Sequence, residues 1–288
     1  MKYMPYNNQK KGMFLAFIGV IFITPDSLLI RLANLTSWDL IFYRGFIPFF
    51  IVFAGLLIIY KKKFILQLLE NGWHGVAYGL IFAIINISFV ISIDNTNVAN
   101  TLIMIALAPM LSAVISFIFL KENTDQKTWI AITITALAVI YIFNDSFEKG
   151  DVLGNFLGLV CATGLAVSAV IIRAAKKINL VPSAMMGKLL VTLIALFFVQ
   201  NPILKGSDLI IIPFMCIFCV AIPFVLITLA PRYIAAAEVN LFFLLETIFG
   251  PLWVWLIIKE QPSIETIIGG IVIISTIATH SVLSLKKT

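Results

Sequence analysis

Two stretches of the sequence repeat one another: residues 107–122 read LAPMLSAVISFIFLKE, and residues 245–260 read LETIFGPLWVWLIIKE. Each starts at a leucine and ends, at the same spacing, on Lys-Glu. The offset between them is 138 residues (245 − 107), about half of the 288-residue chain. Self-similarity at such a distance indicates two related halves.

The composition places both halves in a lipid environment. Hydrophobic residues make up 61% of the chain and charged residues 12%, whereas soluble domains carry about 25% charged residues. A helix needs about 20 apolar residues to cross about 30 Å of hydrocarbon. Blocks of about this length can be marked at 12–33, 39–60, 73–93, 97–120, 127–144, 152–173, 181–200, 208–229, 233–258 and 264–285.

The blocks predict an all-α polytopic membrane protein with ten transmembrane helices. Their apolar runs are continuous, so they do not show the period-two alternation of barrel strands. The breaks between them are too short to hold a soluble domain. We expect the first block to be retained rather than cleaved as a signal peptide, because no small-residue cleavage site follows it.

Basic residues set the expected orientation, since short cytoplasmic loops are enriched in Lys and Arg. With a cytoplasmic N-terminus, fourteen basic residues fall on the inner side and only Lys149, Lys205 and Lys259 on the outer side. The sequence therefore predicts that the N- and C-termini are both cytoplasmic. The net charge of +6 then reflects topology, and no nucleic-acid partner is expected.

Five helices in each half would turn the second half upside down relative to the first. Further matches support the pairing of the halves: Arg31 with Arg173, and Arg44 with Lys188. We expect a first repeat over 12–144 and a second over 152–285. The rest would be a tail at 1–11, an extracytoplasmic linker at 145–151 and a tail at 286–288. Inverted five-helix repeats of this kind are typical of secondary transporters.

At these positions the chain resembles the EamA type of the drug/metabolite transporter superfamily. The matching features are Arg44-Gly45, the Leu-x-Pro of 107–109, and the glutamates Glu122 and Glu260 that follow the fourth and ninth blocks. The resemblance implies two five-helix repeats with both termini in the cytoplasm. Two features depart from the family pattern: lysines 121 and 259 replace a small residue, and Thr247 replaces a proline.

Ionisable residues within the blocks are the candidate site residues, because each charge in hydrocarbon costs about 2.5–3.5 kcal/mol or more. Glu246 is the sharpest candidate, as a substrate or proton site or as a structural ion pair with Lys188 or Arg44. Its counterpart in the first half is Ala108, so the fold does not require a carboxylate there. The following Gly250-Pro251 is expected to weaken the helix.

Asp26 and Glu238 are further acidic candidates. Asp26 follows Pro25 and is expected either in a site or in a local role, capping its segment or pairing with Arg31. Its counterpart, Ser168, carries no charge. Glu238 lies nearer the inner end of the ninth block and is a candidate for gating or binding.

Basic and amide side chains complete the set. Arg44 and Lys188 could extend to the nearer interface, or could pair with carboxylates or an anionic group of a substrate. Asn86 and Asn100 are candidates for hydrogen bonds to a ligand, with packing between helices as the alternative. The three cysteines are expected in packing, and no catalytic residue, metal ligand or cofactor is expected.

The leading functional hypothesis is a secondary transporter in the inner (plasma) membrane that moves a small organic metabolite by alternating access. No Gly-rich phosphate loop occurs, so ATP is not expected to drive it. The interior would hold three acids (Asp26, Glu238 and Glu246) against two bases, which favours a cationic or zwitterionic amino acid or amine.

Proton coupling is a secondary expectation, and membrane lipids are the expected surroundings. The oligomeric state is open between monomer and homodimer. The alternatives are a membrane-embedded enzyme, such as a lipid-linked transferase, and a passive channel.

Overall fold

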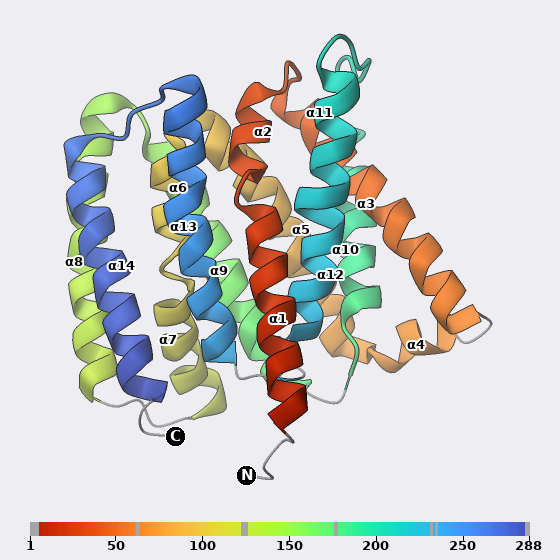
Figure 1. Cartoon of the computed structure of the whole chain (residues 1–288), viewed down its shortest axis with the longest axis horizontal. Coiled ribbons are helices and arrows are strands. Elements are labelled where there is room, and N and C mark those ends of the chain that lie inside the picture. Colours follow the sequence, from red (N-terminus) through yellow and green to blue (C-terminus); the bar gives the residue numbers. More distant parts are fainter. Residues whose placement is uncertain are drawn as a thin grey trace.

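The computed structural model of the protein describes residues 6–61, 64–121, 126–175, 178–230, 233 and 236–285. Within these ranges it describes all side chains except those of residues 6–9, 120, 145–149, 173, 236–241 and 281–285. Every regular element in this part of the chain is helical (Figure 1). The helices are α1 (Tyr6–Ile23), α2 (Asp26–Leu32), α3 (Ser37–Tyr60), α4 (Phe64–Glu70), α5 (Gly72–Asn95), α6 (Val98–Ile105), α7 (Ala108–Leu120), α8 (Gln126–Lys149), α9 (Val152–Ala174), α10 (Val181–Ala195), α11 (Asp208–Phe214), the π-helix η2 (Met215–Ala221), α12 (Ile222–Leu229), α13 (Ala236–Ile258) and α14 (Ile264–Leu285).

Many of these helices are long and apolar enough to cross a membrane. Among the described residues, seven stretches meet that requirement: Lys10–Leu32, Ser37–Tyr60, Gly72–Asn95, Val98–Phe119, Gln126–Asn144, Val152–Ile172 and Asp208–Leu229. Shorter apolar helices cover Val181–Ala195, Phe242–Ile258 and Ile264–His280. The helical content agrees with the predicted all-α polytopic membrane protein, and the count of ten spans stays a prediction.

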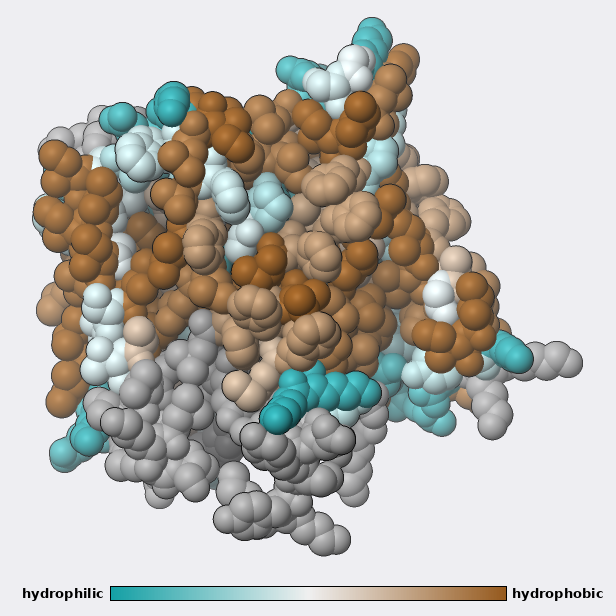
Figure 2. Space-filling view, in the orientation of Figure 1, coloured by the Kyte–Doolittle hydropathy of each residue, from teal (hydrophilic) through white to brown (hydrophobic). Residues whose placement is uncertain are grey.

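The surface also suits a membrane protein. Figure 2 shows a flank dominated by hydrophobic residues, with hydrophilic residues gathered towards the two ends of the helices. Large apolar side chains are exposed on the surface of the molecule. Ile58, Phe119 and Ile210, for example, are 76%, 75% and 76% exposed. Lipid tails are as apolar as these side chains, so their exposure carries no penalty in a bilayer.

Proline interrupts two of the predicted spans, which the sequence had indicated as single helices. Pro25 separates α1 from α2, and Pro109 lies at the start of α7. A proline has no N–H to donate to the carbonyl four residues earlier, and its ring crowds that carbonyl. For Pro109 that residue is Ile105, where α6 ends. The first and fourth spans are therefore each built from two helices.

The break expected at Gly250-Pro251 is not present. Helix α13 runs without interruption from Ala236 to Ile258, with Pro251 inside it. A Cβ at Gly250 would lie 2.3 Å from a methyl group of Leu102, so α13 packs tightly against α6 at this point. Close packing of neighbouring helices can hold a proline within a membrane helix.

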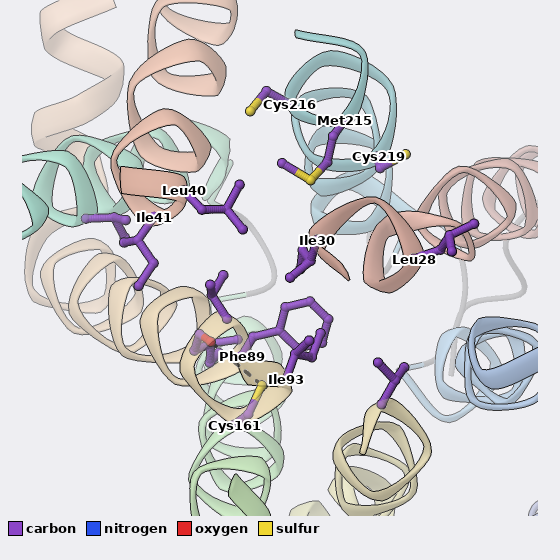
Figure 3. Packing of buried hydrophobic residues seen from close by; sticks show 14 of the residues in the cluster. Leu28, Ile30, Leu40, Ile41, Phe89, Ile93, Cys161, Met215, Cys216 and Cys219 are labelled. Atoms are coloured by element: carbon purple, nitrogen blue, oxygen red, sulfur yellow. Dashed lines mark hydrogen bonds between the residues drawn. The ribbon is translucent and has the colours of Figure 1, made fainter. Parts of the chain in front are cut away.

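Helices that hold the same place in the two predicted halves pack against each other, α3 on α10 and α8 on α14. Helix α1 begins, and α14 ends, at the same end of the molecule (Figure 1). The apolar core joins the halves: Ile30 of α2 lies between Met215 of η2 and Phe89 of α5 (Figure 3). The three cysteines are buried and unpaired with each other, as the packing interpretation expects.

The repeated Lys-Glu pattern has a clear conformational role. Lys121 and Lys259 follow the last residues of α7 and α13, and both adopt a left-handed backbone conformation (φ 53° and 60°). The Lys259 N–H donates to the carbonyl of Trp255. Glycine is the residue that ends helices in this conformation most readily. The family's small residue at these places therefore has a physical cause, and each lysine is strained.

Replacing Lys259 by glycine is expected to stabilise the protein by about 0.5–1 kcal/mol, since the left-handed penalty exceeds glycine's loss of backbone entropy. Thermal unfolding of the detergent-purified protein measures the effect. Lys259→Ala is the matched control, because it removes the same charge but keeps the Cβ. Equal melting temperatures for the two variants would contradict the backbone explanation.

Candidate functional site

Asp26 and Arg44 form a buried ion pair in the interior. The first residue of α2 presents its carboxylate to the guanidinium from α3, with Arg44 Nη1 2.6 Å from Asp26 Oδ1 and Nη2 2.8 Å from Oδ2. Both side chains are only 4% exposed. The predicted local pairing of Asp26 with Arg31 is therefore wrong, as is the extension of Arg44 to the interface. The pair joins the start of α2 to α3 through side chains 18 residues apart, a contact that sequence distance does not reveal.

Lys188 lies equally deep and takes a different partner. It is 1% exposed, and its ammonium donates a hydrogen bond to the Asn86 side-chain oxygen on α5. The Phe82 ring lies 5.4 Å from Nζ and the Phe224 ring 6.0 Å. Among the described residues no carboxylate forms an ion pair with Lys188. The predicted extension to the interface is wrong here too.

Glycines bring α10 close enough to its neighbours to place Lys188 in the interior. A Cβ at Gly45 of α3 would lie 2.9 Å from the Lys188 carbonyl oxygen and 2.5 Å from Thr192 Oγ1. A Cβ at Gly187 would lie 2.7 Å from the carbonyl oxygen of Gly79 on α5. Backbone therefore packs on backbone along both contacts, as small residues allow between membrane helices.

Glu246 is buried without a partner among the described residues. Its side chain is 8% exposed, and it interacts electrostatically with Asp26 and Arg44. No described group hydrogen-bonds to it or forms an ion pair with it, so the predicted structural pair with Lys188 or Arg44 is not formed. An ionised carboxylate in an apolar interior is costly, so a proton or a cation must neutralise it.

The face of α13 that carries Glu246 looks towards the break between α1 and α2. Gly250 and Trp253 follow Glu246 by four and seven residues and so share its face. Trp253 Nε1 donates to Thr24 Oγ1 at 3.4 Å. A Cβ at Gly250 would lie 3.4 Å from the hydroxyl oxygen of Ser27. Glu246 therefore belongs to the same interior region as the ion pair.

A model of the EamA-like transporter family matches residues 10–144 and again residues 152–281. The chain belongs to the EamA-like transporter family. It is therefore a multi-pass membrane protein of a transporter family, as the resemblance implied.

Two similar proteins share little sequence with this member of the EamA-like transporter family. An "Uncharacterized transporter" of Methanothermobacter thermautotrophicus (strain Delta H) is 22% identical over 201 residues, which cover 65% of this chain and 57% of that protein's length. A protein of known crystal structure is 15% identical, with a TM-score of 0.68 over 96% of this chain and 98% of the other. At this identity the structure supports the fold alone.

Asn86 and Asn100 occupy different surroundings in this EamA-like transporter. Asn86 holds Lys188 and also donates to the Phe82 carbonyl at 2.6 Å. Asn100 is 3% exposed, donates to Thr96 Oγ1 at 3.1 Å and accepts from Thr266 Oγ1 at 2.5 Å. Asn100 thus ties α6 to α14, which agrees with the packing alternative. The candidate Glu238 lies outside the described side chains.

Sequence reasoning missed two kinds of residue near the charges. Phe82 and Phe224 flank Lys188, but nothing separates them from the other 22 phenylalanines by sequence. The hydroxyls of Ser27 and Ser168 are buried and have no hydrogen-bond partner among the described residues. The position of Ser27, directly after Thr24-Pro25-Asp26, could have identified it.

A polar network closes the end of the molecule opposite the start of α1 and the end of α14 (Figure 1). Arg31 Nε lies 3.0 Å from Glu260 Oε2, and Arg31 Nη2 donates to the Thr96 carbonyl at 2.7 Å. Glu260 Oε1 accepts the backbone N–H of Val98, at the start of α6, at 2.8 Å. The family's closing glutamate thereby joins α2, α6 and α13.

Breaking the Asp26–Arg44 pair from one side is expected to destabilise the protein by about 3–5 kcal/mol, because the remaining charge stays buried and unpaired. Arg44→Met and Asp26→Ala should each show this loss in thermal unfolding. The double variant should recover much of it, since no charge is then left alone. A double variant as unstable as the sum of the single ones would show that the pairing is unimportant.

Proposed function

We propose that the protein is a secondary transporter that carries a small organic cation or zwitterion, such as an amino acid or amine, across the inner (plasma) membrane. The single observation that carries this proposal is Glu246, a buried carboxyl group with no partner among the described residues. The family membership supplies the transport class, and the site supplies the charge of the cargo.

The electrostatics of the interior favour this assignment. Arg44 is already neutralised by Asp26, so it has no need of a further anion, and Asp26 has no need of a further cation. Glu246 and Lys188 remain without an ion-pair partner among the described residues. The carboxyl group of Glu246 can be neutralised by an ammonium group of the cargo or by a proton. Competition between these two at one carboxylate would couple transport to a proton gradient.

Alternating access of two inverted repeats is the proposed mechanism. The repeats would comprise 12–144 and 152–285, each with five spans and both termini in the cytoplasm. The contacts of α3 with α10 and of α8 with α14 support a two-fold relation between the halves. The network of Arg31 and Glu260 would then close the outer side, and its rupture would accompany opening.

Substrate class and coupling can be tested on the purified protein. A thermal-shift screen against amino acids, amines, nucleosides and nucleotides should show stabilisation by compounds that carry an ammonium group. The best compound is then used for counterflow in proteoliposomes, where saturation separates a carrier from a passive channel. Chemical conversion of that compound by the protein would instead support a membrane-embedded enzyme.

Glu246→Gln is expected to lower uptake at least tenfold and to remove the dependence of uptake on an imposed pH gradient. The glutamine amide is uncharged, so it can neither take up a proton nor pair with an ammonium group. Glu70→Gln makes the same chemical change at the end of α4, and transport should be unchanged. Wild-type pH dependence in Glu246→Gln would remove Glu246 from the mechanism.

Loss of the outer network should favour an outward-open state. A variant without native cysteines and with Ser27→Cys, a position that is 1% exposed, reports on access to the interior. Adding Arg31→Ala should speed its labelling by an impermeant maleimide from outside several-fold. The double variant Arg31→Glu/Glu260→Arg exchanges the two charges and should slow labelling again. Lys205→Ala, which removes a basic residue outside this network, is the control and should leave the labelling rate unchanged. Equal labelling rates in all variants would contradict this gate.

A further inference from the structure

The two halves treat their matched basic residues differently. Arg44 and Lys188 occupy equivalent places in the predicted repeats, and so, approximately, do Asp26 and Ser168. In the first half the acid neutralises the base. In the second half the position of the acid holds a serine, and Lys188 meets no carboxylate among the described residues. One negative charge that the first half contains is thus missing from the second.

The surroundings of Lys188 are those of a binding group rather than of a packed structural lysine. An ammonium group has three N–H donors, and within the described residues Lys188 uses one of them, in its hydrogen bond to the Asn86 oxygen. The aromatic rings of Phe82 on α5 and Phe224 on α12 stabilise a cation without neutralising its charge. Ser168, whose sequence position approximately matches that of Asp26, likewise has a buried hydroxyl with no hydrogen-bond partner among the described residues.

We infer that Lys188 binds a carboxylate of the transported molecule, which takes the part that Asp26 plays opposite Arg44. Asn86 is the positioning residue, because it fixes the ammonium by a hydrogen bond and adds no negative charge. A carboxylate fits the single charge that is missing, whereas a phosphate dianion would bring an excess. This inference rests on the proposed function and narrows it: with Glu246 facing an ammonium group, the cargo carries a carboxylate as well as an ammonium group and is a zwitterion.

Matched ligands separate the two charges of the cargo. Phenylalanine carries both groups, phenethylamine lacks the carboxylate, and 3-phenylpropionate lacks the ammonium group; the same triplets can be made for other side chains found in the thermal-shift screen. For wild type we expect the zwitterion to bind at least tenfold more tightly than either partial compound. Lys188→Met should remove the advantage over the amine and leave binding of the amine unchanged.

Asn86→Asp provides a variant that tests the inference without removing the lysine. The new carboxylate would lie at hydrogen-bonding distance from the ammonium and would occupy it permanently. We expect a higher melting temperature without ligand and at least a tenfold loss of affinity for the zwitterion. Asn100→Asp is the matched control, since it buries a carboxylate away from Lys188 and should lower the melting temperature.

The outcomes distinguish this inference from the proposed function. If carboxylates bind and Lys188→Met abolishes their binding, but Glu246→Gln changes nothing, then the carboxylate site stands and the role of Glu246 fails. If amines alone bind, and Lys188→Met and Asn86→Asp bind them like wild type, the proposed function stands and the inference is overturned. The inference is also overturned if none of the carboxylate-bearing compounds stabilises the wild-type protein.

Discussion

The cost of an uncompensated charge in a medium without water governs the interior of this protein. Every ionised group there needs an opposite charge or a proton, because lipid and apolar side chains cannot solvate it. Asp26 and Arg44 meet this requirement within the fold, and their pair holds the start of α2 against α3. Glu246 and Lys188 form no ion pair with any described group. The described interior thus holds one paired set of charges and two side chains without an ion-pair partner. The proposed transport of a charged molecule would supply those partners.

Proline breaks concentrate the polar chemistry in the same region. Pro25 ends α1 directly before Asp26 and Ser27, so two polar side chains begin a new helix inside the protein. Irregular backbone at membrane depth is tolerated where protein covers it, and here α13 covers it through Gly250 and Trp253. The carboxylate of Glu246 belongs to that covering helix. Break, ion pair and unpaired acid are therefore parts of one arrangement.

The sequence predicted the features that repeat better than those that do not. The periodic apolar blocks and the Lys-Glu pattern predicted helices and their ends, because these depend on local composition and backbone conformation. Partners of single side chains were harder to predict. One alternative paired Asp26 with Arg31, five residues away, but Asp26 pairs with Arg44 of α3 and Arg31 pairs with Glu260. At Gly250-Pro251 the expected interruption does not occur: α13 is continuous there, where Gly250 packs tightly against α6. Such contacts depend on how helices pack, which local sequence does not encode.

The choice of arginine in one half and lysine in the other has a physical logic. A guanidinium binds a carboxylate through two parallel hydrogen bonds, and the Asp26–Arg44 pair uses this geometry for a contact that stays inside the protein. An ammonium is a point charge on a flexible stem and accepts partners from many directions. Under the proposed function the protein must release its cargo as well as bind it, and a tight bidentate contact with the cargo would slow release. Lysine at 188, held by a neutral amide, suits a partner that comes and goes.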